Sequence, residues 1–227
     1  PGEHREKLSF KHLSTMTAGL DWNEHYTNPF DITAKTYYGR NIPELLYKQV
    51  SVSEVPGLNY EYQSGATQYL GMALEKATGQ SLAFLAQEWL WKPMGAEHDA
   101  FWRLDDKGGN ALSFCCFNSN ARDFARFGKL LSHNGSWNGN QILDSSFVAM
   151  ASQGNKVPYY GYSFWIDDQH FDTPIFYMRG ILGQYIISIP EKDLVIVRLG
   201  KRRLAKAQGS VHPLDFISIC SEVIKAY

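Results

Sequence analysis

The chain has 227 residues, of which 44% are hydrophobic and 20% charged, the balance of an ordinary globular protein. Its net charge of -1 excludes a global field that would attract nucleic acid or an anionic membrane. No apolar run reaches the roughly 20 residues of a membrane helix, and three cysteines, two of them the neighbours Cys115 and Cys116, indicate no disulfide framework.

The N-terminal part predicts one short helix and then a long irregular segment. Ser9 can cap a helix whose inward side chains are Phe10, Leu13 and Met16. Residues 20–60 are rich in loops, with a short helix expected near 42–50, and such a segment is either a binding wall or lid or a packed meander. Its aromatic side chains are expected at the surface: Trp22, Tyr26, Phe30, Tyr37 and Tyr38.

The stretch 56–94 predicts a polar segment followed by two helices. Apolar residues recur at helical spacing over 66–78, and Gly79 can end that helix in a left-handed conformation. A second helix is expected after Ser81, with Leu82, Leu85 and Trp89 on one buried face. Tyr62 lies just before the first helix, where it can be a catalytic phenol or simply a packed side chain.

The second half changes from helices to strands. Asn120 can cap a helix in which Asp123 takes the third position. Short runs rich in β-branched and aromatic residues then predict an antiparallel sheet, and an amphipathic helix follows at 213–226. The expected strands are 160–166, 175–178, 184–189 and 194–199. We therefore expect an α+β fold, with a helical region at 1–155 and antiparallel strands and a terminal helix at 156–227. One helix beside four strands leaves one sheet face to be covered.

Several simple kinds of site are not indicated. The seven histidines show no metal-ligand spacing, and Glu97-His98-Asp99 is too compact to surround one ion. Gly180-x-x-Gly183 lacks the context of a nucleotide fingerprint, and Lys201-Arg202-Arg203 is typical of a solvated turn. No G-x-S-x-G motif is present. We expect no metal, no cofactor and no nucleic-acid partner.

Six segments of the chain, taken together, form a specific pattern: LSFKHLSTMTAGLDWNE (8–24), PGLNYEYQSGATQYLGMALEKATGQSL (56–82), LWKPMGAEHDAFW (90–102), CCFNSNARDFARFGKLL (115–131), NGSWNGNQIL (134–143) and RGILGQYIISIPEKDLVIVRLG (179–200). In this order they resemble segments of the serine β-lactamase superfamily, in its class C-like and penicillin-binding-protein-like branch. The resemblance implies the α+β serine β-lactamase/transpeptidase-like fold. It also implies a serine hydrolase that cleaves amide or ester bonds of small substrates through an acyl-enzyme.

The resemblance implies roles for the tyrosine motif. Tyr62-Gln63-Ser64 matches the family's Y-x-S pattern, so Tyr62 is the expected acid-base residue and Ser64 the partner of substrate or lysine. A free phenol has a pKa of about 10 and needs a nearby cation to act as a base near neutrality. Tyr60 is a rival for the same role, although its spacing to the helix fits less well.

The family's K-T-G strand corresponds to Met178-Arg179-Gly180. Gly180 would let a substrate carbonyl approach the strand, and the Ile181 N–H would form half of the oxyanion hole. Arg179, Gly180, Tyr26 and Trp22 are the expected substrate-binding residues. Without the lysine and threonine, the resemblance favours an esterase, amidase or oligomer hydrolase over penicillin resistance. In the alternative interpretation, 175–189 is only a hairpin with Gly183 at a bulge.

One part of the family pattern is missing. No serine is followed three residues later by lysine, and the nearest approach is Ser119-Asn-Ala-Arg122. We expect a C-terminal portion of a longer chain, inactive alone, whose N-terminal remainder upstream of Pro1 supplies S-x-x-K. The alternative is a catalytically silent ligand-binding or sensing domain. Family members are often periplasmic or exported, and the compartment of this chain stays open.

Overall fold

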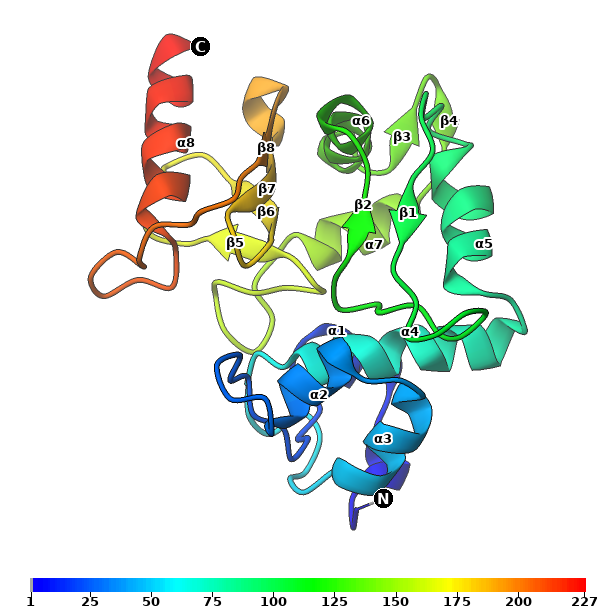
Figure 1. Ribbon diagram of the computed structural model, residues 1–227. Helices are drawn as coiled ribbons and strands as arrows, with labels where there is room; N and C mark the ends of the chain where they lie inside the picture. The colour runs from blue at the N-terminus through cyan, green and yellow to red at the C-terminus, as the bar shows by residue number, and fades with distance from the viewer. Residues whose placement is uncertain (1) are drawn as a thin grey trace. The chain divides into compact units, whose positions relative to one another are not determined.

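A computed structural model describes residues 2–227 and combines helices with antiparallel strands, which confirms the expected α+β class (Figure 1). The chain forms two compact units, residues 1–93 with 99–118 and residues 94–98 with 119–227. The boundary expected between 155 and 156 stays a prediction. Within the described residues, no helix has the length and apolar character needed to span a bilayer.

The first unit is mainly helical. Its helices are α1 (Phe10–Ser14), α2 (Ile32–Tyr38), α3 (Ile42–Gln49), α4 (Ser64–Thr78) and α5 (Leu82–Ala86), with a 3-10 turn at Arg5–Lys7, a π-helical turn at Gln87–Trp91 and the short strands β1 (Phe101–Trp102) and β2 (Phe117–Asn118). Helix α2 lies in the segment expected to be loop. Thr33, Ala34 and Thr36 are buried there, so packing selects a helix where local propensity is weak.

Helix α4 is hydrogen-bonded to two other segments of this unit. Gln68, fully buried, donates to the carbonyl of Ala111 at 3.0 Å and accepts from the N–H of Ser113 at 3.0 Å. The Tyr69 hydroxyl donates to the Leu46 carbonyl. Gly79 ends the helix at φ 68°, as its position predicts. The helix that follows the tyrosine motif is therefore fixed on two sides.

Two apolar side chains expected to face inward are exposed. Trp89 is 55% exposed because α5 changes to π winding at Gln87, which moves this residue off the face of Leu82 and Leu85. Phe10 is 48% exposed at the first turn of the five-residue α1, whereas Leu13 is buried. Both predictions assumed a regular α-helical period that these short segments do not keep.

Adjacent cysteines form a disulfide in the first unit, contrary to expectation. Cys115 and Cys116 are bonded, and Cys116 takes the left-handed conformation at φ 68°. The carbonyls of Cys115 and Cys116 accept hydrogen bonds from the Trp102 indole at 2.9 Å and from the Arg103 N–H at 3.2 Å. Cys220 remains a free, buried thiol.

The second unit is built on one antiparallel sheet in the order β5-β6-β7-β8, which confirms the predicted hairpin-linked sheet. Its elements are β5 (Trp165–Asp167), β6 (Ile175–Arg179), β7 (Gln184–Ile189), β8 (Leu194–Leu199), α6 (Ala121–Ser132), α7 (Ser145–Ala151), α8 (Leu214–Ala226), the short pair β3 (Ser136–Trp137) and β4 (Asn140–Gln141), and a 3-10 turn at Pro190–Lys192. The strand expected over 160–166 is shorter than predicted. Gly161 lies against the Ala151 carbonyl and Ser163 has φ 66°, so the chain turns before β5.

Helices cover both faces of this sheet (Figure 1). On one face Phe216 of α8 stacks on Tyr177, with ring centroids 4.0 Å apart. On the other, Gly128 of α6 lies so close to β8 that an added Cβ would be 2.6 Å from Val195. The sequence left one face of this sheet without an assigned cover, and α6 supplies that cover.

Helix α6 begins with a buried carboxylate. The Asn120 side chain accepts from the N–H groups of Arg122 and Asp123, as expected of a cap. Asp123, fully buried, accepts from the N–H groups of Glu97 and His98 and from Arg126. Burial opposes its ionisation, but the hydrogen bonds from Glu97, Asn120 and Arg126 outweigh burial and lower the pKa of Asp123 to about 2.

Candidate functional site

The tyrosine motif lies in extended chain that leads into α4. Gln63 is the residue before the helix, and its φ of -137° is extended. Its buried side chain donates to the Leu20 carbonyl at 3.0 Å. Tyr62 is half-buried, and Ser64 is the first helical residue and only 5% exposed. Gln63 therefore anchors the backbone between Tyr62 and Ser64.

Glu24 organises the polar side of this motif. Its Oε2 accepts from the Ser64 N–H at 2.8 Å and from the Trp22 indole at 2.8 Å. Its Oε1 accepts from the Ser64 hydroxyl. A carboxylate at the first turn of α4 also complements the positive end of the helix dipole. One side chain thus binds both the start of α4 and the segment before α2.

Tyr26 joins the same cluster. Its hydroxyl donates to Glu24 Oε1 and lies 3.3 Å from Ser64 Oγ. Burial of the phenol raises the pKa of Tyr26 well above its ordinary value, and the neighbouring Glu24 raises it further. The side chain is therefore a neutral hydrogen-bond donor near neutral pH. The residue is 49% exposed, so a ligand can reach it.

Trp22 is not the exposed wall residue that was expected. It is 5% exposed, and its ring lies under α4, where an added Cβ on Gly65 would be 2.4 Å from Trp22 Cε3. Its indole N–H donates a hydrogen bond to Glu24. The prediction of surface exposure is wrong because a glycine in the first turn of α4 opens room for the indole.

The other expected site residues lie in the second unit, on the β6–β7 hairpin. Arg179 ends β6, its guanidinium lies 3.4 Å from the centroid of the Trp165 ring, and it donates to the Val211 carbonyl at 2.9 Å. The Gly180 N–H donates to the Gln184 carbonyl at 2.8 Å. Ile181 is 50% exposed in the turn, and Gly183 has φ 79° there.

The structure thus gathers the predicted residues in two groups. Trp22, Tyr26 and Ser64 converge on Glu24, and Tyr62 lies two residues before Ser64 in the chain. Arg179, Gly180 and Ile181 follow one another on one hairpin. Sequence reasoning missed Glu24. The signal was the spacing of Trp22, Glu24 and Tyr26 at every second residue, which points the three side chains the same way in extended chain.

Known proteins show similarity to this chain in sequence and in fold. The family model described as Beta-lactamase matches residues 1–210. A solved structure from Bacillus anthracis, provisionally named a 6-aminohexanoate-dimer hydrolase, is 25% identical with a TM-score of 0.77, over 96% of this chain and 60% of that one. The chain therefore spans less than two thirds of that protein. A comparison with curated proteins gives no match.

Two further structures share the fold at lower identity. The octameric penicillin-binding protein homologue from Pyrococcus abyssi is 16% identical, with a TM-score of 0.64 over 96% of this chain and 56% of that one. A family VIII carboxylesterase is 14% identical, with a TM-score of 0.62 over 88% of this chain and 66% of that one. From the match over residues 1–210, the chain belongs to the Beta-lactamase family.

Proposed function

We propose that this chain carries part of the active site of a serine hydrolase that cleaves amide or ester bonds of small substrates through an acyl-enzyme. The observation that carries the proposal is the anchored motif Tyr62-Gln63-Ser64 in front of α4. Catalytic groups act best when they are held rigidly in one geometry. Membership of the Beta-lactamase family supports the same reaction class.

In this proposal Tyr62 is the proton shuttle. It takes the proton of the attacking serine hydroxyl and returns it to the leaving amine or alcohol, and the same transfer with water releases the acid product. Ser64 is the adjacent hydrogen-bonding group for the substrate. Glu24 is a positioning residue, since it holds the Ser64 hydroxyl and N–H together.

The oxyanion donor would come from the β6–β7 hairpin. The turn at Gly180 and Ile181 is held by the bond from the Gly180 N–H to the Gln184 carbonyl. Ile181 is half exposed, and a backbone N–H in a rigid turn suits a developing negative charge. Gly180 leaves room for a substrate carbonyl beside the strand.

The nucleophile is assigned to residues outside this sequence. No serine in residues 1–227 has a lysine three residues later. The proposal therefore places S-x-x-K in the N-terminal remainder of the same protein, where its lysine would be the cation that a tyrosine base requires. On this proposal, the 227-residue chain alone is inactive.

The substrate class follows from the altered strand motif. Met178-Arg179-Gly180 lacks the lysine and threonine of K-T-G, so an ester, an amide or a short oligomer is favoured over a penicillin. The names of two structural neighbours, a dimer hydrolase and a carboxylesterase, are consistent with such substrates. A small molecule is the proposed substrate.

Covalent labelling tests the assignment of the nucleophile. A fluorophosphonate probe should label the full-length protein on a serine and should leave the 227-residue chain unlabelled. Mass spectrometry of the labelled peptide identifies the serine. Labelling of the 227-residue chain would contradict the assignment. An unlabelled, folded full-length protein would favour the catalytically silent, ligand-binding alternative.

Two tyrosines give a matched test of the proton shuttle. In the full-length enzyme, Tyr62→Phe should lower the hydrolysis rate by about 10²–10⁴, the usual contribution of a positioned acid-base group. Tyr60→Phe, two residues away and also half-buried, should leave the rate within a few-fold. Equal rates for Tyr62→Phe and the wild type would remove Tyr62 from the mechanism.

A further inference from the structure

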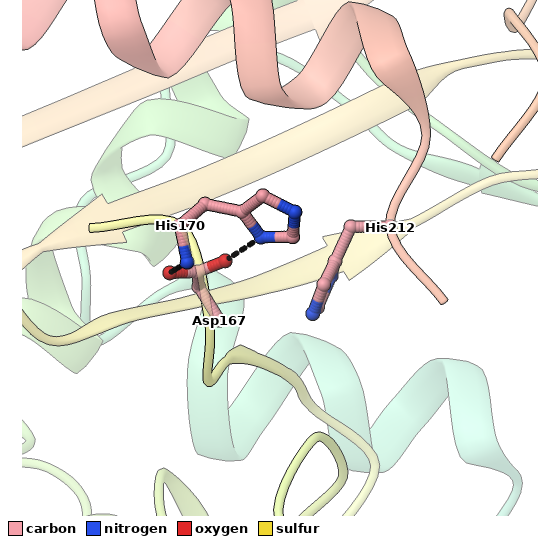
Figure 2. Close-up of side chains that lie close together, drawn as sticks. All are labelled: Asp167, His170 and His212. Atoms are coloured by element: carbon pink, nitrogen blue, oxygen red, sulfur yellow. Dashed lines mark hydrogen bonds and ion pairs between the residues drawn. The ribbon is translucent and has the colours of Figure 1, made fainter. Parts of the chain in front are cut away.

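Two histidines and an aspartate from separate segments of the second unit lie together in Figure 2. Asp167 is the last residue of β5, His170 follows in the next loop, and His212 precedes α8. Each offers one donor atom, and these atoms lie within 4.8 Å of one another. None of them belongs to the proposed hydrolase site.

The cluster is largely closed off from solvent. The Asp167 side chain and His212 are fully buried, and 19% of the His170 side chain is exposed. Asp167 Oδ1 lies 2.7 Å from His170 Nδ1, and its Oδ2 accepts from the N–H groups of His170 and Phe171 at 3.1 Å. A buried carboxylate is stable only when it is paired, hydrogen-bonded or bound to a metal. The backbone bonds hold Asp167 in position, with Oδ1 turned to the imidazoles.

His212 is oriented from its other side. Its Nδ1 is 2.8 Å from the Tyr177 hydroxyl in the middle of β6. Its other ring nitrogen, Nε2, lies 3.2 Å from Asp168 Oδ1. A metal-binding imidazole commonly has its second nitrogen hydrogen-bonded in this way, which fixes the ring and its tautomer. Tyr177 is itself stacked on Phe216, so this support is rigid.

We propose that Asp167, His170 and His212 bind one zinc ion, with Asp168 as the fourth ligand. Two imidazoles and carboxylate oxygens are donors that zinc accepts, and four protein ligands are typical of a structural site. Ligand atoms in a tetrahedral zinc site lie about 3.3 Å apart, given bonds of about 2.0–2.1 Å. The candidate atoms of Asp167, His170 and His212 lie within 4.8 Å of one another, so side-chain rotation brings them to this spacing as the ion binds, and the proton between Asp167 and His170 is released to solvent.

The ion would join two segments that are far apart in sequence. It would tie the loop after β5 to the segment before α8, where Arg179 already contacts the Val211 carbonyl. The sequence gives no local sign of such a site, because His212 lies 42 positions after His170. This inference does not depend on the proposed hydrolase activity, and it differs from the sequence-based expectation of no metal.

Zinc titration of the chelator-stripped protein tests the proposal directly. Competition with a chromogenic zinc indicator should give one zinc ion per chain. Zinc at 100 times its Kd should raise Tm by about 5–10 °C. A wild-type protein that takes up no zinc would overturn the proposal.

Matched variants locate the ion. His170→Gln should weaken zinc binding at least about 10-fold, and Tyr177→Phe about 10-fold through loss of its contact with His212. His133→Gln is the control, because His133 Nε2 also lies 2.7 Å from a carboxylate oxygen, of Asp193, outside the cluster. Far-UV circular dichroism checks that each variant is folded. Equal zinc affinity in His170→Gln and the wild type, or an equal loss in His133→Gln, would overturn the assignment.

Discussion

Helices α4 and α6 both begin beside a carboxylate, but the carboxylates come from different places. In α6, Asn120 and Asp123 lie within three residues of the helix start, and Asn120 caps it locally. In α4, the Gln63 side chain makes no capping hydrogen bond. The Ser64 N–H instead donates to the carboxylate of Glu24, 40 residues earlier in the chain. The start of α6 is therefore encoded beside the helix, whereas the start of α4 depends on a distant segment.

The two carboxylates are therefore expected to have different roles. Asp123 is fully buried and accepts hydrogen bonds from the backbone of Glu97 and His98. Glu24 binds Ser64, two residues after the proposed proton shuttle Tyr62, and the exposed Tyr26. Changes at Asp123 should therefore affect unfolding, and changes at Glu24 should affect both unfolding and activity.

The largest effect is expected at α6. Asp123→Ala should lower the free energy of unfolding by about 3–5 kcal/mol, the range for removing one partner of a buried ion pair, because it also leaves the N–H groups of Glu97 and His98 without their acceptor. Urea unfolding measures the loss. Asp144→Ala, at the exposed cap of α7, is the control and should lose about 1 kcal/mol. Equal losses in the two variants would contradict this interpretation.

A smaller effect is expected at α4. Glu24→Ala should lower the free energy of unfolding by about 1.5–3 kcal/mol, the range for hydrogen bonds to a charged group. In the full-length protein the proposed hydrolase activity should also fall. Glu61→Ala, whose exposed carboxylate accepts from Gln63, is the control and should change stability by less than about 0.5 kcal/mol. Full activity in a folded Glu24→Ala enzyme would exclude a positioning role.

Close packing of α6 on the sheet gives a third prediction. Alanine usually stabilises a helix relative to glycine, but Gly128→Ala should lower the free energy of unfolding by about 1–3 kcal/mol through overpacking against Val195. Thermal or urea unfolding measures the change. Much of the loss should disappear in a Val195→Ala background. A more stable Gly128→Ala protein would show that α6 moves away from the sheet freely.

The smallest expected effect is a pH dependence. The pKa of Asp123 is lower in the folded chain than in the unfolded chain, so its stabilisation is full above about pH 4 and is lost as the pH falls toward 2. Between about pH 4 and pH 3 the loss should be about 1 kcal/mol. Comparison of the urea midpoints of the wild type and Asp123→Asn at each pH isolates the contribution of Asp123 to the pH dependence. Parallel pH profiles would assign the effect to other carboxyl groups.

Local pattern was enough to predict the helix cap at Asn120, the strands over 175–199 and the final helix. These elements have regular spacing, capping residues and turn residues near each other in sequence. Other structural features depend on tertiary packing, which the local sequence pattern does not show. Helix α2 forms around buried threonines, and α6 covers the sheet because Gly128 permits close approach.

The candidate site was only partly predictable for the same reason. The motif at Tyr62 could be found along the chain, because its residues are consecutive. The alternate spacing of Trp22, Glu24 and Tyr26 points these side chains the same way, but the contact of Glu24 with Ser64 forms only after α4 and the segment before α2 have packed, so local pattern does not show it. Trp22 was expected at the surface because it lies in a loop-rich segment. Its contact with Gly65 of α4, which buries the indole ring, cannot be seen from the local sequence.

The bond between Cys115 and Cys116 has a consequence for chemical labelling of the native chain. The remaining thiol, Cys220, is fully buried, and burial raises its pKa to about 12, so thiolate is scarce at neutral pH. The folded, oxidised protein should therefore give almost no colour with Ellman's reagent. Reduction before the assay should release two reactive sulfhydryls, and denaturation should add the third.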